Sequence, residues 1–425
     1  MISSALRTQS KTELLTAHFY SPGRMEERMS VDYLRSENSI VSAVRANNYS
    51  LVELIPAVKQ SMELIGGLNS IVRPGDKVFV KINHLSPPSP PERGIVTHPI
   101  FVEAALTLLK EMKVEIVVGD DIEEGNVDGY TISRFREMCD RQGVKLVNLK
   151  EMGFVAKPCK GKLLKNVYIS KIVDEADVLI NLPKFKTHSL TIFTGGIKNL
   201  YGVVPDGLRR RFHRDYLRPE DFCQMLVDVY SITKPELTII DGVMAMEGEG
   251  PGSGKMRNLG LILAGKDTTA VDAVASRIIG VKPEDVLTTR YAGERGLGIS
   301  DLKKIKIAGE KLASCAVPDF KLPVNAYRLA VKSVPYALIK QILKQVAPRP
   351  RIKKKNCTAC NQCVKACPTG AAAMVGKTAA INDKLCIRCM CCHEVCRFNA
   401  VYPGRSFLGN ILYGMFRAAR RTVRA

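Results

Sequence analysis

The chain has 425 residues, of which 46% are hydrophobic and 25% are charged, and its net charge is +21. This length predicts two or three domains, and this composition excludes a disordered or collagen-like chain. The sequence contains no run of about 18 apolar residues that would span a membrane, and residues 1–20 lack the apolar core of a signal peptide. We therefore expect a cytoplasmic protein.

The positive charge is concentrated in the C-terminal quarter. Residues 326–425 contain 19 Lys and Arg but only two acidic residues, whereas the first 325 residues contain 44 basic and 40 acidic residues. Nine of the 13 cysteines also lie between Cys357 and Cys396. The last quarter is therefore a chemically distinct part of the chain.

Residues 1–37 are polar and unpatterned, and we expect a disordered N-terminal extension without an assigned role. Over residues 38–315, strand-like apolar runs alternate with helical patterns. Strands are expected at 40–44, 77–83, 114–120, 178–182, 237–241 and 259–264. Helices are expected at 51–65, 99–112, 218–233 and 270–279. This alternation predicts an α/β domain with a largely parallel sheet.

Ligands bind beyond the carboxyl ends of the strands in such sheets, so the polar residues there are the first functional candidates. Four basic residues follow the strand at 178–182, namely Lys184, Lys186, His188 and Lys198. Basic side chains and backbone N–H groups in this arrangement can bind a carboxylate or phosphate, which predicts an anionic small molecule as ligand. The alternative for this stretch is a solvated basic loop.

Acidic and imidazole side chains follow other expected strands. Asp241 is a candidate catalytic residue, although an Asp241-Gly242 turn is the alternative. General acid or base chemistry, or binding of a hard cation, is also open to Asp120, Asp121 and Glu247, and His98 could transfer protons near neutral pH. Asp272 lies inside an expected helix, where we expect it to cap or pack.

A glycine-rich stretch at residues 248–254 does not match known nucleotide-binding spacings. A P-loop would require glycine at Glu249 and a hydroxyl residue at Met256, and G-x-G-x-x-G would require glycine at Ser253 or Lys255. The stretch is either a loop that closes over a ligand or a plain strand connection.

These segments resemble the uncharacterised DUF362 family over about residues 40–310. The most specific matches are Asn181-Leu182-Pro183-Lys184-x-Lys186-Thr187-His188, Lys198-Asn199 with Gly202, and Gly248-x-Gly250-Pro251. Members of this family are often fused to a ferredoxin module. The resemblance therefore implies an iron-sulfur-linked protein, without implying a particular reaction.

Residues 316–355 form an expected basic linker. Apolar residues between 333 and 346 recur on one face of an amphipathic helix, and Pro348 and Pro350 then end it. This pattern predicts a domain boundary before the cysteines.

The cysteines form an internal repeat. Cys357-x2-Cys360-x2-Cys363-x3-Cys367 recurs 29 positions later as Cys386-x2-Cys389-x2-Cys392-x3-Cys396. Three thiolates spaced by two residues can ligate one 4Fe-4S cluster, while the fourth ligates the other cluster. We therefore predict two 4Fe-4S clusters with crossed ligation, one held by Cys357, Cys360, Cys363 and Cys396 and one by Cys386, Cys389, Cys392 and Cys367.

Residues 356–404 thus resemble a bacterial-type two-cluster ferredoxin module, which implies a small α+β domain. Arg397 stands where many such modules have proline, and Cys391 lies outside the repeat, where we expect a packed thiol. Zinc is the main alternative, although structural zinc sites usually pair two C-x2-C knuckles across a dozen or more residues.

Residues 405–425 predict a basic amphipathic helix. One face carries Leu408, Ile411, Leu412, Met415 and Phe416, and arginines occupy the other face. Such a helix can lie on an anionic membrane surface such as that of the inner membrane, bind a partner protein, or pack on its own chain.

The fusion of the two parts favours an electron-transfer protein or oxidoreductase, in which the clusters pass single electrons to or from a site or partner at the α/β domain. The excess of positive charge favours an acidic redox partner. The alternatives are a binding or regulatory protein whose clusters are structural or sense oxygen, and a non-redox enzyme. The basic quarter has no recognised nucleic-acid motif and no interleaved aromatic residues, which argues against nucleic acid.

Overall fold

The computed structural model describes residues 38–85, 87–122, 128–216, 218–323, 348–396, 398–407 and 410–411. The extension at 1–37, the linker helix at 333–346 and nearly all of the basic helix at 405–425 lie outside the described residues. Of the helices within the described residues, none is long and apolar enough to cross a membrane.

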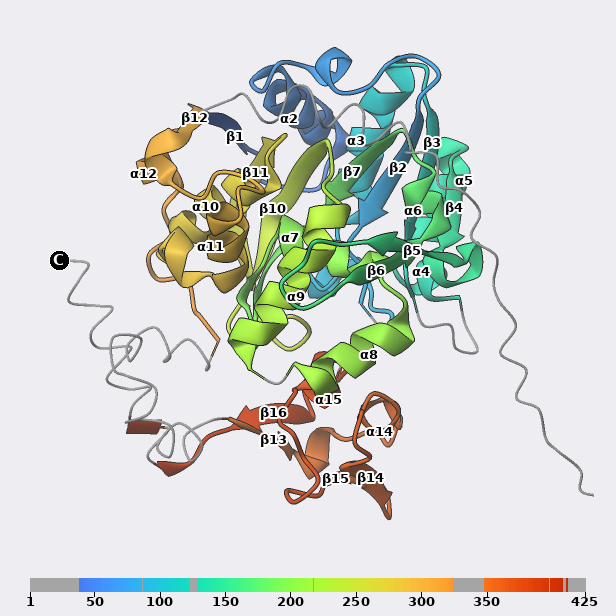
Figure 1. Cartoon of the computed structure of the whole chain (residues 1–425), viewed down its shortest axis with the longest axis vertical. Helices are drawn as coiled ribbons and strands as arrows, with labels where there is room; N and C mark the ends of the chain where they lie inside the picture. Colours follow the sequence, from blue (N-terminus) through green and yellow to red (C-terminus); the bar gives the residue numbers. More distant parts are fainter. Residues whose placement is uncertain are drawn as a thin grey trace, which may run out of the picture.

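A ten-stranded sheet forms the centre of the first domain (Figure 1). The strands of this domain are β1 (Ser39–Arg45), β2 (Lys77–Ile82), β3 (Glu115–Asp120), β4 (Lys145–Asn148), β5 (Phe154–Pro158), β6 (Asn166–Ser170), β7 (Val178–Leu182), β8 (Lys184–His188), β9 (Ile192–Thr194), β10 (Leu237–Glu247), β11 (Lys255–Gly265) and β12 (Ile305–Gly309). The order is β12-β1-β11-β10-β7-β2-β3-β4, with β8 paired to β10 and β9 to β8. Strand β11 is antiparallel to β1 and β10, and β9 to β8, whereas the other pairs of this sheet are parallel.

Helices cover both faces of the sheet. They are α2 (Leu51–Glu63), α3 (Pro99–Glu111), α4 (Gly129–Ile132), α5 (Phe135–Gln142), α6 (Lys171–Asp174), α7 (Gly196–Asn199), α8 (Asp206–Asp215), α9 (Pro219–Ile232), α10 (Thr268–Ile278), α11 (Leu287–Glu294) and α12 (Leu312–Cys315). In β2, Val78 and Val80 share an apolar core with α2 and α3, whereas Phe79 packs in the core that contains α9. Successive side chains of a strand point to opposite faces, so continuous apolar runs such as this one require cover on both sides.

The expected α/β domain with a largely parallel sheet is confirmed. All strands and helices expected between residues 38 and 315 are present, and their ends differ from the expected ones by a few residues except in β10 and β11. Strand β10 continues to Glu247, so Asp241 lies within a strand and the predicted turn at Asp241-Gly242 is wrong. The solvated loop considered for residues 184–188 is also wrong, because β8 is a fully buried strand.

The second domain is a small α+β unit. Its strands β13 (Arg349–Ile352) and β16 (Val401–Gly404) pair with each other, as do β14 (Ala372–Val375) and β15 (Thr378–Ile381). Two one-turn helices, α14 (Gln362–Lys365) and α15 (Cys391–Glu394), occupy equivalent positions of the 29-residue repeat. Figure 1 shows α15 at the top of this domain, next to the α/β domain.

Candidate functional site

Strand β8 carries three of the predicted site residues. Lys184, Lys186 and His188 are each 1% exposed, and they alternate along the strand. Side chains two residues apart share one face of a strand, so these three groups line the same side of β8. Pairing of β8 with β10 places Lys184 opposite Asp241, another predicted site residue.

Lys184 and Asp241 form a buried ion pair. Lys184 Nζ lies 2.8 Å from Asp241 Oδ2 and donates to the Tyr49 hydroxyl at 2.6 Å. That hydroxyl donates in turn to Asp241 Oδ1 at 2.8 Å, and the backbone N–H of His98 donates to Oδ2 at 2.9 Å. Burial lowers the pKa of Lys184, against the attraction of Asp241. Each of the two charges thus has a partner within the protein. We therefore expect the pair to hold β8 and β10 in place beside the site.

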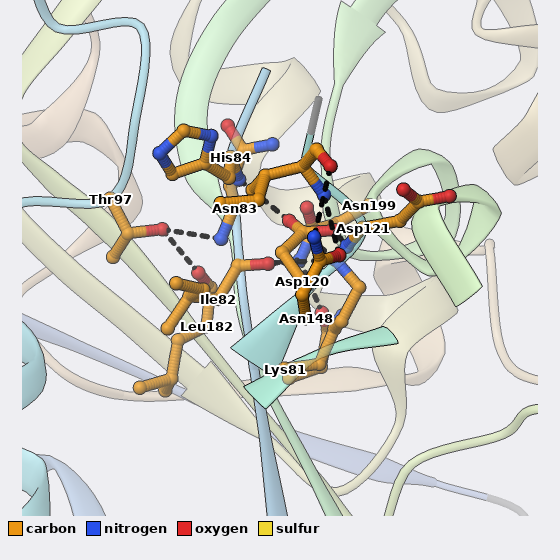
Figure 2. A network of polar contacts seen from close by, with 12 residues as sticks. Lys81, Ile82, Asn83, His84, Thr97, Asp120, Asp121, Asn148, Leu182 and Asn199 are labelled. Carbon is orange, nitrogen blue, oxygen red and sulfur yellow. Dashed lines mark hydrogen bonds and ion pairs between the residues drawn. The ribbon is translucent and has the colours of Figure 1, made fainter. Parts of the chain in front are cut away.

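A second buried ion pair joins β2 and β3 (Figure 2). Lys81 Nζ lies 2.8 Å from Asp120 Oδ2, which also accepts from the backbone N–H of His84 at 2.6 Å. Next to it, Arg209 Nη2 lies 2.7 Å from Asp121 Oδ2. Arg209, in the arginine run of α8, is half-buried by this contact.

Among the described residues, Lys186 and Lys198 are cations of the site without an ion-pair partner at close range. Lys186 Nζ donates to the Ile95 carbonyl at 2.7 Å, and Lys198 Nζ lies 4.9 Å from the centre of the Tyr201 ring. Within the described part of the chain, no carboxylate oxygen lies within ion-pair distance of either ammonium group. Burial lowers the pKa of Lys186 to about 7 and that of Lys198 to about 8. The site therefore has an excess of positive charge.

His188 has a defined tautomer. Its Nδ1 accepts from the backbone N–H groups of Leu190 at 3.1 Å and Thr191 at 3.4 Å. A neutral imidazole with Nδ1 as acceptor carries its proton on Nε2, and burial lowers the pKa of His188 well below its usual value. The Nε2–H group has no hydrogen-bond partner among the described residues and remains a donor directed into the site.

Glu394 from the second domain enters this site. Its Oε1 lies 3.5 Å from His188 Nε2, and its carboxylate stabilises the charged forms of Lys186 and Lys198. Burial raises the pKa of Glu394 to about 7. No sequence motif marks Glu394 as a site residue, and its one signal is that it is one of only two acidic residues in the basic quarter, two positions after Cys392.

The glycine-rich stretch is the hairpin connection between β10 and β11. Its Gly250 packs on β8 so closely that a Cβ atom would lie 2.1 Å from the Thr187 carbonyl oxygen. A Cβ atom on Gly252 would lie 2.6 Å from the carbonyl oxygen of Glu394. Of the two interpretations left open by the sequence, the structure shows the strand connection, which also contacts α15.

The remaining candidates have structural contacts. Asp272 accepts from the backbone N–H groups of Gly196 at 2.7 Å and Ile197 at 3.1 Å, so it caps α7, the helix that carries Lys198. The expected capping role is therefore confirmed. His98 caps α3, and its ring stacks on Tyr49 with centroids 3.6 Å apart. The Glu247 carboxylate accepts from the Lys321 backbone N–H at 3.0 Å.

The repeat cysteines surround two separate hollows in the second domain. The first cage consists of Cys357, Cys360, Cys363 and Cys396, and the second cage of Cys367, Cys386, Cys389 and Cys392. These are the two crossed sets that the spacing predicts. All eight thiols are free of disulfides.

The cages fit iron-sulfur clusters better than single metal ions. The backbone N–H groups of Ala379 and Val401 donate to Cys357 Sγ at 3.4 Å and Cys396 Sγ at 3.3 Å, as is usual around cluster-bound sulfur. No three His, Cys, Asp or Glu side chains in the described ranges are arranged to hold one metal ion. The ligation itself stays a prediction.

Comparisons with known proteins match both domains. Residues 78–277 match the model for a domain of unknown function, DUF362, and residues 349–397 match the model for a 4Fe-4S dicluster domain. A thylakoid-associated protein of Synechocystis sp. is 30% identical over 295 residues, which cover 67% of this chain and 91% of that protein.

A solved structure also shows a distant likeness. The lactate racemase apoprotein from Thermoanaerobacterium thermosaccharolyticum aligns with a TM-score of 0.38 and 11% identity. The alignment covers 57% of this chain and 57% of that chain.

Proposed function

Because this chain belongs to the DUF362 family and carries a 4Fe-4S dicluster domain, we propose that it is an iron-sulfur electron-transfer protein or oxidoreductase whose α/β domain binds a small anion. The observation that carries the proposal is the contact of Glu394 with His188. Glu394 follows Cys392 by two residues, so the second cage adjoins the basic site on β8. Single-electron exchange is the chemistry that two 4Fe-4S clusters supply when bound.

The charges of the site support an anionic ligand. Lys81, Lys184 and Arg209 each have an aspartate partner, whereas Lys186 and Lys198 share only the more distant carboxylate of Glu394. A buried charge without a partner is costly, so one further negative charge from a ligand would complete the site. A carboxylate or phosphate group has this charge and accepts hydrogen bonds from ammonium groups.

Each residue then has a distinct role. Lys186 and Lys198 bind the anion, and the Nε2–H group of the neutral His188 donates a hydrogen bond to it. The pair of Lys184 and Asp241 holds β8 and β10 in place behind them.

The test is anaerobic purification followed by iron and sulfide analysis, EPR of the reduced protein and native mass spectrometry of any anion that co-purifies. We expect about eight irons per chain, as two cubanes require. We also expect the co-purifying anion to be lost from the double variant Lys186→Met, Lys198→Met. Clusters that accept no electron from dithionite would refute the redox part, and unchanged anion content in that variant would refute the assigned site.

We further propose peripheral contact with an anionic membrane surface on the cytoplasmic side. Support comes from the basic residues of 405–425 and from the name of the Synechocystis relative, which is thylakoid-associated. The full chain should sediment with vesicles that contain anionic lipid, and a chain that ends at residue 404 should not. Equal sedimentation of the two chains would contradict this.

A further inference from the structure

The two halves of the cysteine repeat share a backbone conformation but differ in exposure. Asn361 and Met390, at equivalent positions, have φ of 63° and 65°, and the one-turn helices α14 and α15 follow them. Cys360 is exposed, whereas its equivalent Cys389 is partly buried. The first cage therefore presents to solvent an edge that is less accessible in the second cage.

The same position of the repeat carries opposite charges in the two halves. Glu394 ends α15 and faces the basic site of the α/β domain, and its equivalent 29 residues earlier is Lys365, at the end of α14. Lys365 is exposed. In the second half of the repeat, Glu394 thus contacts the basic site of the α/β domain, whereas the equivalent Lys365 of the first half is basic and exposed.

Two further exposed lysines adjoin the first cage. Lys354 and Lys355 are exposed and directly precede the first cage, and Lys354 O accepts from the backbone N–H of Cys357 at 3.1 Å. Asp383 is the one acid of residues 348–411 besides Glu394, and it is engaged by Arg351 Nη1 at 2.9 Å. The face around the first cage therefore has no acidic side chain of its own domain that would offset its lysines.

We propose that this face, made of Lys354, Lys355, Lys365 and the exposed loop at residues 358–360, is the docking surface for an acidic one-electron carrier protein. The inference rests on the proposed redox function, and it assigns the first cage to the outside partner and the second cage to the α/β site. In each encounter one electron passes between carrier and chain, so that one is oxidised and the other reduced by one electron. Complementary charges at the rim of such an interface speed and orient the encounter.

The test uses the holoprotein and an acidic plant-type ferredoxin as the probe. In the variant Lys354→Glu, Lys355→Glu, Lys365→Glu, we expect the Kd measured by calorimetry at low ionic strength to rise at least tenfold. We also expect the salt dependence of binding to weaken. The matched control is Lys303→Glu, Lys304→Glu, Lys306→Glu, three exposed lysines at β12 and the turn before it. The control should bind within about twofold of the wild type.

Several outcomes would overturn the proposal. One is unchanged binding in the first variant, and another is an equal loss in the control, which would reveal an effect of net charge alone. Loss of binding to anionic vesicles with unchanged carrier binding would assign the face to a membrane instead. Iron content should stay the same in both variants, because no lysine is a cluster ligand. Clusters that dithionite cannot reduce would refute the redox function, whereas the binding measurement does not depend on electron flow.

Discussion

The two domains of this chain differ in the interactions that stabilise each fold. The α/β domain buries large apolar side chains on both faces of a wide sheet, in three extensive cores. Within the described residues, the buried apolar cluster of the second domain consists of Cys363, Ala379, Cys392, Cys396, Ala400 and Val401, of which three are cage cysteines. A few more small or cysteine side chains and Met390 are buried outside it. So small an apolar core provides little stability, and a domain of this kind usually depends on disulfides or metal. We therefore expect burial of apolar side chains to determine the fold of the first domain and cofactor binding to determine the fold of the second.

Removal of iron tests whether the second domain needs a bound cofactor to fold. Binding free energy of a structural metal is folding free energy, so the second domain should unfold in the apoprotein while the α/β domain stays folded. By hydrogen exchange, β13–β16 should lose protection by about a thousandfold or more, and β2 and β7 should keep theirs. Retained protection of β14 and β15 without iron would show that the second domain folds by burial after all.

Substitution of Asp241 tests the α/β domain in the corresponding way. Asp241→Ala leaves Lys184 buried without its carboxylate, and such a loss costs about 3–5 kcal/mol of unfolding free energy. The double variant Lys184→Met, Asp241→Leu removes both charges and should recover most of that stability. Urea denaturation with iron content as a second readout separates the domains, because the second domain should keep its iron in these variants. Equal destabilisation by the single and double variants would show that shape, and not charge, is lost.

The pH dependence of anion binding tests the role of Lys186 and Lys198, the two lysines without a close ion-pair partner among the described residues. The ammonium groups bind anions only when protonated, and burial lowers the pKa of Lys186 to about 7 and that of Lys198 to about 8. Glu394, Asp120, Lys184, Arg209 and Lys81 face these two lysines.

Affinity for oxalate, a dianion between about pH 6 and 9, should thus be full only well below pH 7, where both lysines are protonated. It should fall by about tenfold for each charge lost as the pH rises first through 7 and then through 8. Isothermal titration calorimetry measures this, and Lys198→Met should remove the upper part of the decline. An affinity that stays constant from pH 6 to 9 would contradict the assigned role of the two lysines.

The smallest expected effect concerns the helix that carries Lys198. Asp272→Ala removes the cap of α7, and the expected loss of unfolding free energy is about 1–2 kcal/mol. Asp272→Asn keeps one acceptor oxygen and should lose less. Thermal unfolding measures the difference, and an alanine variant as stable as the wild type would show that the cap is dispensable.

The sequence predicts best the features that depend on local spacing. The two cage sets follow from positions within a 40-residue segment, and the strands of the sheet follow from continuous apolar runs such as that of β2. Strand β8 could not be predicted in this way, because three of its five residues are ionisable. Its two lysines are buried with partners that Tyr49, Ile95 and Asp241 supply from distant segments.

Contacts between domains are similarly hidden in the sequence. The position of Glu394 depends on how the second domain docks on β8, which no local pattern encodes. The half-buried position of Arg209 depends on Asp121, 88 residues earlier in the chain. The lysines and the histidine can therefore be proposed as site residues from the sequence, whereas the contribution of Glu394 from the second domain cannot.

The crossed sets of cysteines determine the order in which a nascent chain can assemble. Three thiols of the first cage are synthesised early, but its fourth, Cys396, is synthesised after the last thiol of the second cage, Cys392. During synthesis, the second cage is thus complete before the first. A chain that stops between Cys367 and Cys386 leaves both cages unfinished, so neither half of the repeat is a separable unit of assembly.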